Sequence, residues 1–197
     1  MKEGQDTSTD SEIEERMIRI TGPMSPTIYI VLLALMTALT TVGTIVFVIP
    51  FPSTAGYFNL GDAMVMISGL LLGPVGGLIA GGVGSAMGDV ALNYLPYAPI
   101  TLVVKGGEGL VVGTISRYAM RDRNFSFWDI LAVILGSVIM LAGYFVCEVL
   151  ILGISSGFAL LELITINSIQ VIMGSIIALI VGPILRYFLQ GYTASQE

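Results

Sequence analysis

The sequence predicts an all-α integral membrane protein, a bundle of six transmembrane helices with both termini in the cytoplasm. Three observations support this fold class. Hydrophobic residues make up 55% of the 197 positions, charged residues make up only 11%, and the mean hydropathy is +0.90. Apolar runs recur that reach the length of about 20 residues needed to cross a bilayer. Lysine and arginine are concentrated in alternate connecting segments, which is typical of a multi-pass protein.

Turn-forming and charged residues divide the apolar sequence into six expected spans. Pro50 and Pro52 end the first span. Gly73-Pro74 separates the second span from the third, because proline disfavours continuation of the helix that precedes it. A Pro/Tyr turn at 94–99 ends the third span, and the polar segment 121–124 ends the fourth. The expected helices are Thr27–Ile49, Asn59–Leu72, Val75–Asn93, Ile100–Met120, Phe127–Leu152 and Leu161–Leu189.

The basic residues predict the orientation. Lysine and arginine are retained on the cytoplasmic side of a membrane, and seven of the eight fall on one side if the number of spans is even. That side also receives both termini, whereas the eighth basic residue, Lys105, lies inside a span. We therefore expect an acidic, disordered cytoplasmic tail at 1–25, a membrane domain at 26–190 and a short cytoplasmic tail at 191–197.

The composition excludes several kinds of site. The chain has no histidine, which excludes a histidine zinc site and a serine-histidine dyad. Its single cysteine, Cys147, cannot form an intrachain disulfide. Basic residues are too scattered for a nucleic-acid surface. We expect no catalytic residue, no metal ion and no cofactor.

Polar residues inside five of the expected spans form pairs spaced i, i+3 or i, i+4, so that each pair lies on one helix face. A charge in the hydrocarbon layer is costly, which makes such residues functional or paired. All five pairs lie toward the helix ends assigned to the outside, in a layer roughly 5 to 15 Å below the surface. The inner half contributes almost none. The pairs are Asn59 and Asp62, Asp89 and Asn93, Lys105 and Glu108, Tyr144 and Glu148, and Asn167 and Gln170. They predict a substrate pocket open to the outside.

These pairs also have structural interpretations. Lys105 could form an ion pair with Asp89 or Glu108, and the pair that opens the second helix could favour its N-terminus. The two amides of the last helix could join helices. Glu148 lies mid-helix with no basic residue near it in the sequence, so a functional role is clearest there.

Small residues predict close helix contacts. A pair in the first helix, Ala34 and Ala38, suits packing within the chain or against a partner. A stripe in the third helix recurs every four residues and consists of Gly73, Gly77, Gly81 and Ser85. Glycine at this spacing lets helix backbones approach each other.

Taken in order, these motifs resemble those of a known family. The first helix carries Ala34-x-x-x-Ala38, Asn59-Leu60-Gly61-Asp62 opens a short second helix, and the Gly-rich third helix ends in Gly88-Asp89. Tyr97-Ala98-Pro99 then leads to Lys105-Gly106-Gly107-Glu108-Gly109. The combination resembles the substrate-binding S component of energy-coupling factor (ECF) transporters, and looks most like the riboflavin-transporter-like branch. The resemblance extends over roughly residues 26–189.

The resemblance implies a cell-membrane protein that captures a vitamin or related micronutrient from outside. It also implies a transmembrane coupling protein and two cytoplasmic ATPases as partners. It assigns Ala34 and Ala38 to the contact with the coupling protein, the loop Pro50–Phe58 to a lid, and the substrate site chiefly to the last three helices. The only tryptophan, Trp128, lies at the cytoplasmic start of the fifth helix, so an indole-lined flavin slot is not evident. The surplus of acids suits a donor-rich heterocycle, with pyridine, pyrimidine and flavin-like compounds all open.

Two functions of other classes remain as alternatives. In a stand-alone proton-coupled carrier, Asp62, Asp89 and Glu148 would relay protons. The scarcity of ionisable groups in the inner half and the lack of an inverted repeat oppose it. In an intramembrane aspartyl hydrolase, Asp62 and Asp89 would be the catalytic pair, but Gly88-Asp89 is preceded by Ala86-Met87 rather than by a Gly-x motif.

Overall fold

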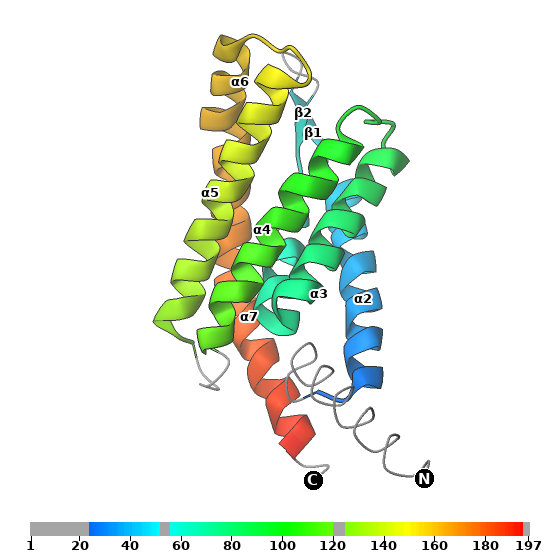
Figure 1. Ribbon diagram of the computed structural model, residues 1–197, viewed down its shortest axis with the longest axis vertical. Helices are drawn as coiled ribbons and strands as arrows, with labels where there is room; N and C mark the ends of the chain where they lie inside the picture. Colours follow the sequence, from blue (N-terminus) through cyan, green and yellow to red (C-terminus); the bar gives the residue numbers. More distant parts are fainter. Residues whose placement is uncertain (1–23, 52–55, 120–124, 195–197) are drawn as a thin grey trace, which may run out of the picture.

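The computed structural model describes residues 24–51, 56–119 and 125–194 (Figure 1). In chain order the elements are α2 (Pro26–Val46), β1 (Ile49–Phe51), β2 (Gly56–Phe58), α3 (Gly61–Ala91), α4 (Ala98–Ala119), α5 (Phe127–Leu150), α6 (Ser156–Glu162), the π-helical turn η1 (Leu163–Asn167) and α7 (Ser168–Ala194). Five helices within these ranges are long and apolar enough to cross a membrane, with α6 to α7 taken as one and α3 counted once. The prediction of a helical membrane protein is therefore confirmed. Most of the expected acidic tail, and residues 195–197, lie outside the described residues.

The first helix is shorter than predicted and is followed by a small β-hairpin. Helix α2 ends at Val46 rather than at Ile49, and Ile49 instead begins β1. β1 pairs antiparallel with β2, so that Pro50 lies opposite Tyr57. A residue before proline avoids the helical conformation, and β-branched and aromatic residues favour strands. The segment expected to be a loop at 50–58 therefore contributes most of this hairpin, of which 52–55 lie outside the described residues.

Helix α3 is broken at Gly73, where the sequence predicts an interruption. Gly73 has φ 72° and ψ −164°, a conformation open essentially only to glycine. A Cβ atom on Gly77 would lie 2.9 Å from the Cα of Gly69, and one on Gly81 would lie 2.8 Å from the Val65 side chain. In a straight helix these pairs would be roughly 12 and 24 Å apart. The two arms of α3 therefore fold back against each other.

The glycine stripe of α3 packs against the backbone of α4. A Cβ atom on Gly77 would lie 2.2 Å from the carbonyl oxygen of Gly109, and one on Gly109 would lie 2.1 Å from that of Gly77. A Cβ atom on Gly81 would lie 2.7 Å from the carbonyl oxygen of Lys105. Because backbone atoms already occupy these places, only glycine fits. The predicted close approach is present, and it sets α4 against α3 at the level of Lys105.

The last helical stretch runs without a gap through α6, η1 and α7. It starts at Ser156, before the predicted Leu161, and continues past the predicted end at Leu189. In the wide π-helical turn, the Ser168 hydroxyl donates to the carbonyl oxygen of Leu163 at 2.6 Å. The prediction of the start was wrong because small polar residues at 155–157, typical of a loop, here form the first turn.

A buried ion pair joins the first turn of α5 to α7. The first turn of α5 lies toward the end of the bundle away from the β-hairpin, where α2 begins and α7 ends (Figure 1). Arg186 of α7 binds Asp129 of α5 through two contacts of 2.5 and 3.2 Å, and also donates to the carbonyl oxygen of Leu70 at 3.4 Å. Both charged side chains are at most 3% exposed. Asp129 lies roughly 28 Å along α5 from Glu148. The expectation that this half of the bundle contributes almost no polar groups is therefore corrected.

The contact between Gly77 and Gly109 predicts a steep cost for a single methyl group. Gly77→Ala should destabilise the protein by about 1–3 kcal/mol, because the neighbouring backbone must shift to admit it. The measurement is thermal unfolding of the purified protein in detergent. Gly157→Ala is the matched control, since nothing lies within 4 Å of a Cβ atom there. Equal melting temperatures for the two variants would contradict the packing described.

Candidate functional site

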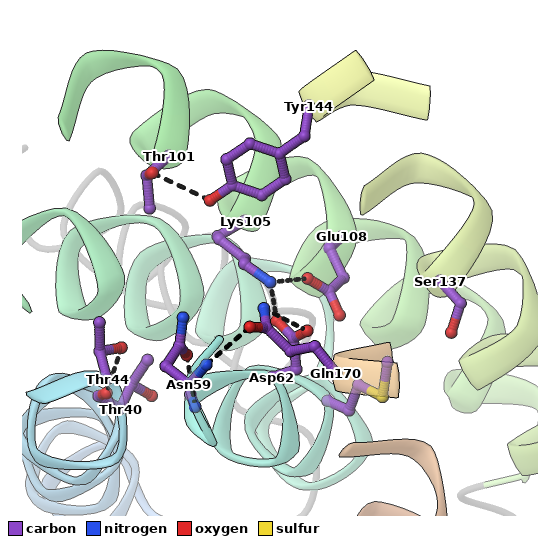
Figure 2. A network of polar contacts seen from close by, with 12 residues as sticks. Thr40, Thr44, Asn59, Asp62, Thr101, Lys105, Glu108, Ser137, Tyr144 and Gln170 are labelled. Atoms are coloured by element: carbon purple, nitrogen blue, oxygen red, sulfur yellow. Dashed lines mark hydrogen bonds and ion pairs between the residues drawn. The ribbon is translucent and has the colours of Figure 1, made fainter. Parts of the chain in front are cut away.

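The centre of the site is a buried cation between two carboxylates. The ammonium group of Lys105, on α4, forms an ion pair with Asp62 at the start of α3 and lies 3.3 Å from the Glu108 carboxylate, one turn along α4. The Lys105 side chain is 2% exposed and both acids are 0% exposed. Figure 2 shows the three side chains converging. Among the partners considered for Lys105 from sequence, Glu108 is present, and Asp62 takes the place of Asp89.

A chain of hydrogen bonds extends this cluster to the last helix. The side-chain amide of Gln170 donates to Asp62 at 2.9 Å, and its oxygen accepts from the backbone N–H of Asn59 at 2.7 Å. The Asn59 side chain in turn accepts from the N–H of Gly61 at 2.8 Å, which satisfies a free donor at the start of α3 (Figure 2). The network therefore joins α3, α4 and α7 at the hairpin end of the bundle.

Asp89 and Tyr144 belong to separate contacts. The Tyr57 hydroxyl donates to Asp89, which ties β2 to the far end of α3. Burial, together with the negative charge of Asp89, raises the pKa of the Tyr57 hydroxyl, so that this group remains a donor. The hydroxyls of Tyr144 and Thr101 lie 2.9 Å apart and join α5 to α4. Because Asp62 is engaged with Lys105, the two aspartates do not form one catalytic pair.

A small cavity lies among these groups at the hairpin end. Its volume of about 20 Å³ is room for one or two water molecules. Every helix of the described ranges contributes to its walls, and Tyr57 of β2 lines it as well. The lining residues are Thr44, Tyr57, Asn59, Ser85, Asp89, Tyr97, Thr101, Lys105, Tyr144, Glu162, Asn167 and Gln170.

The structure brings nine of the ten predicted site residues to this region and leaves one apart. Those that line the cavity are Asn59, Asp89, Lys105, Tyr144, Asn167 and Gln170. Asp62 and Glu108 do not line the cavity but contact Lys105, which does. Glu148 likewise interacts with Glu162, another lining residue. Asn93 is exposed in the turn between α3 and α4. Its φ of 66° is a left-handed conformation that asparagine tolerates, which gives it a structural reason to be there.

Tyr57 belongs to the loop that the family resemblance assigned to a lid, and it lines the cavity. Five further cavity residues were not predicted as site residues: Thr44, Ser85, Tyr97, Thr101 and Glu162. A signal existed for two of them, because Ser85 precedes Asp89, and Thr101 precedes Lys105, by one helical turn of four residues. Glu162 had no such signal. It lies five residues before Asn167, a spacing that the π-helical turn between them explains and an α-helical pattern does not detect.

The small-residue pair of the first helix faces outward. Ala34 and Ala38 are exposed on α2, as are their neighbours Leu35 and Leu39. In the described part of the chain, no other segment covers this face. The pair is therefore available to contact lipid or another protein.

The charge cluster predicts a large effect of neutralising Lys105. Lys105→Met should lower stability by about 3–5 kcal/mol, because Asp62 and Glu108 would be left buried without a cation. The double variant Asp62→Asn, Lys105→Met should recover part of this loss, since one of the two unpaired charges is then gone. Thermal unfolding in detergent measures both. A single variant as stable as the original protein would show that the ion pair contributes nothing.

Comparison of the sequence with known proteins identifies the family of this chain. A model of the family "ECF-type riboflavin transporter, S component" matches residues 25–193. A protein of Pyrococcus woesei, named "Uncharacterized protein in gap 3'region", is 38% identical over 146 residues. The matched part is 74% of this chain and 93% of that protein. The thiamine precursor transporter HmpT of Lactococcus lactis subsp. cremoris (strain MG1363) is 31% identical over 156 residues, 79% of this chain and 86% of HmpT.

The family match begins before α2 and reaches the last turn of α7, and the apolar helices agree with it. The matching family and HmpT are both described as transporters or transporter components. This chain is therefore a multi-pass membrane transport component rather than an enzyme, and it belongs to the ECF-type riboflavin transporter S component family.

Proposed function

We propose that this chain captures a vitamin or related heterocyclic micronutrient from outside the cell and delivers it inward as the S component of an ECF-type importer. A transmembrane coupling protein and two cytoplasmic ATPases would complete the transporter. The observation that carries the proposal is a polar-lined cavity at one end of a bundle in this family. Such a cavity offers selective contacts on one side of the membrane.

The topology that suits this function has six spans and two cytoplasmic termini. Each arm of α3 would then cross the membrane, with the short first arm of roughly 18 Å relying on neighbours to match the bilayer. The placement of Arg117 in the last turn of α4, and of Arg186 near the end of α7, supports a cytoplasmic assignment for the end away from the hairpin. The cavity would then lie on the outer side.

The proposed substrate site is the cavity itself. The predicted residues would have two different roles there. Asn59, Asp89, Tyr144, Asn167 and Gln170 would contact the ligand. The cluster of Asp62, Lys105 and Glu108 would hold these walls in place, since both carboxylates already engage the ammonium group of Lys105. A vitamin ring needs far more than 20 Å³. Entry would therefore require β2 to move and Tyr57 to leave Asp89.

The contact with the coupling protein would form on the exposed face of α2. Small side chains at Ala34 and Ala38 let a partner helix approach the backbone closely, which is how helices associate in a membrane. This face lies on the outside of the bundle, away from the cavity-lining side of the helix. Binding of substrate and binding of the partner would thus use different surfaces of one chain.

The proposal predicts that transport and substrate binding can be separated. The variant Ala34→Leu, Ala38→Leu should abolish uptake into cells or vesicles that contain the coupling protein and ATPases. Affinity of the purified variant for substrate should stay within about twofold, because surface changes away from a site rarely matter more. Uptake of labelled substrate and calorimetric binding are the two measurements.

Ala142→Leu is the matched control, since Ala142 is an exposed alanine on α5. It should leave uptake unchanged. Unchanged uptake in the α2 double variant would contradict the assignment of this face. Uptake by the chain alone, abolished by a protonophore, would replace the proposal with a proton-coupled carrier.

A further inference from the structure

Two carboxyl groups lie together at the edge of the cavity. Glu148, near the end of α5, is 0% exposed, and Glu162, the last residue of α6, is 2% exposed. The two side chains interact with each other, and Glu162 lines the cavity. Both oxygens of Glu148 and one of Glu162 have no hydrogen-bond partner among the described residues. Adjacent buried carboxyls cannot both be ionised unless a positive charge accompanies them.

The basic residues of the described ranges are engaged or distant. Lys105 is paired with Asp62 and Glu108, a cluster that already carries one negative charge in excess when all three are ionised. Arg186 is paired with Asp129 at the opposite end of the bundle. Arg117 lies in the last turn of α4, also away from the hairpin end. If both carboxyls are ionised, the positive charge beside them must therefore come from outside these ranges.

The π-helical turn η1 places an amide beside the pair. It begins directly after Glu162 and ends at Asn167, which lines the same cavity and is 5% exposed. Widened turns of this kind cost helical regularity and recur at functional sites. The amide of Gln170 is already used at both its atoms, whereas Asn167 adds a donor and an acceptor to the wall. The cavity wall therefore places carboxyl oxygens, which are strong acceptors, next to an amide group that can both donate and accept hydrogen bonds.

We propose that Glu148 and Glu162 bind an amidine-type edge of the substrate, an amino group next to a protonatable ring nitrogen, as in an aminopyrimidine. This inference rests on the proposed function and narrows its substrate class. A carboxylate accepts two parallel N–H bonds from such an edge, and the ring proton supplies the missing positive charge. Asn167 lies where it can meet the adjoining ring atom. Tyrosine side chains at 57, 97 and 144 offer faces for the ring.

The test compares matched ligands on the full-length protein in detergent by calorimetry. The probes are hydroxymethyl-aminopyrimidine, the pyrimidinone in which a carbonyl replaces its amino group, and riboflavin. The original protein should bind the aminopyrimidine at least tenfold more tightly than the pyrimidinone. Glu162→Gln should weaken aminopyrimidine binding about 10- to 100-fold, as expected for loss of a charged hydrogen bond, and change pyrimidinone binding less than about threefold.

Two controls keep the result interpretable. Glu162→Gln removes a buried charge without changing side-chain size, so the ligand-free variant should melt at the same temperature as the original protein or above it. Thr165→Val alters the same turn at a partly exposed residue that does not line the cavity, and should leave all affinities unchanged.

The outcomes separate the two proposals. Equal weakening of both pyrimidines in Glu162→Gln would overturn the amidine assignment, because the carboxyl would then only shape the cavity. Tight binding of riboflavin, with no binding of the aminopyrimidine, would also overturn it while leaving the S-component function in place. Failure of all three probes, and of a wider vitamin panel, to bind the original protein would overturn the proposed function itself.

Discussion

The ion pairs of Lys105 are the interaction on which the hairpin end of the molecule depends. A lone ammonium group in an apolar bundle is expensive, and two carboxylates from α3 and α4 compensate for it. Asp62 is then held in place and accepts a hydrogen bond from Gln170, which brings α7 into the same cluster. One buried charge therefore holds α3, α4 and α7 together, although the residues involved are far apart in the sequence. The cavity lies against this fixed wall.

Glycine makes that convergence possible. The side chain of Lys105 can reach the start of α3 only because α3 and α4 approach until backbone atoms touch at Gly77 and Gly109. The fold-back of α3 at Gly73 brings the arm that carries Asp62 beside the arm that packs on α4. A methyl group at these positions would separate the helices, and the ion pair would lengthen with them.

Polar groups are gathered at both ends of the bundle but serve different purposes. At the end away from the hairpin, Arg186 and Asp129 satisfy each other with two contacts and tie α7 to α5. At the hairpin end, both carboxyl oxygens of Glu148 and one of Glu162 have no hydrogen-bond partner inside the described ranges. Satisfied buried charges stabilise a fold, whereas unsatisfied ones beside a cavity are available to a ligand. This asymmetry agrees with the proposed binding of substrate from one side of the membrane.

The sequence by itself determined the membrane class, the break at Gly73 and most of the polar layer, because hydropathy, proline and i, i+4 spacing act locally along the chain. The stripe of small residues in α3 likewise predicted close packing between helices. Only the tertiary structure decided that Lys105 pairs with Asp62, since residues 43 positions apart meet by helix packing alone. It also decided that Glu162 lines the cavity and that Asn93 is exposed in the turn between α3 and α4. The reason is that the π-helical turn and a left-handed turn residue each change which way a side chain faces, without altering the hydrophobic pattern from which helices are predicted.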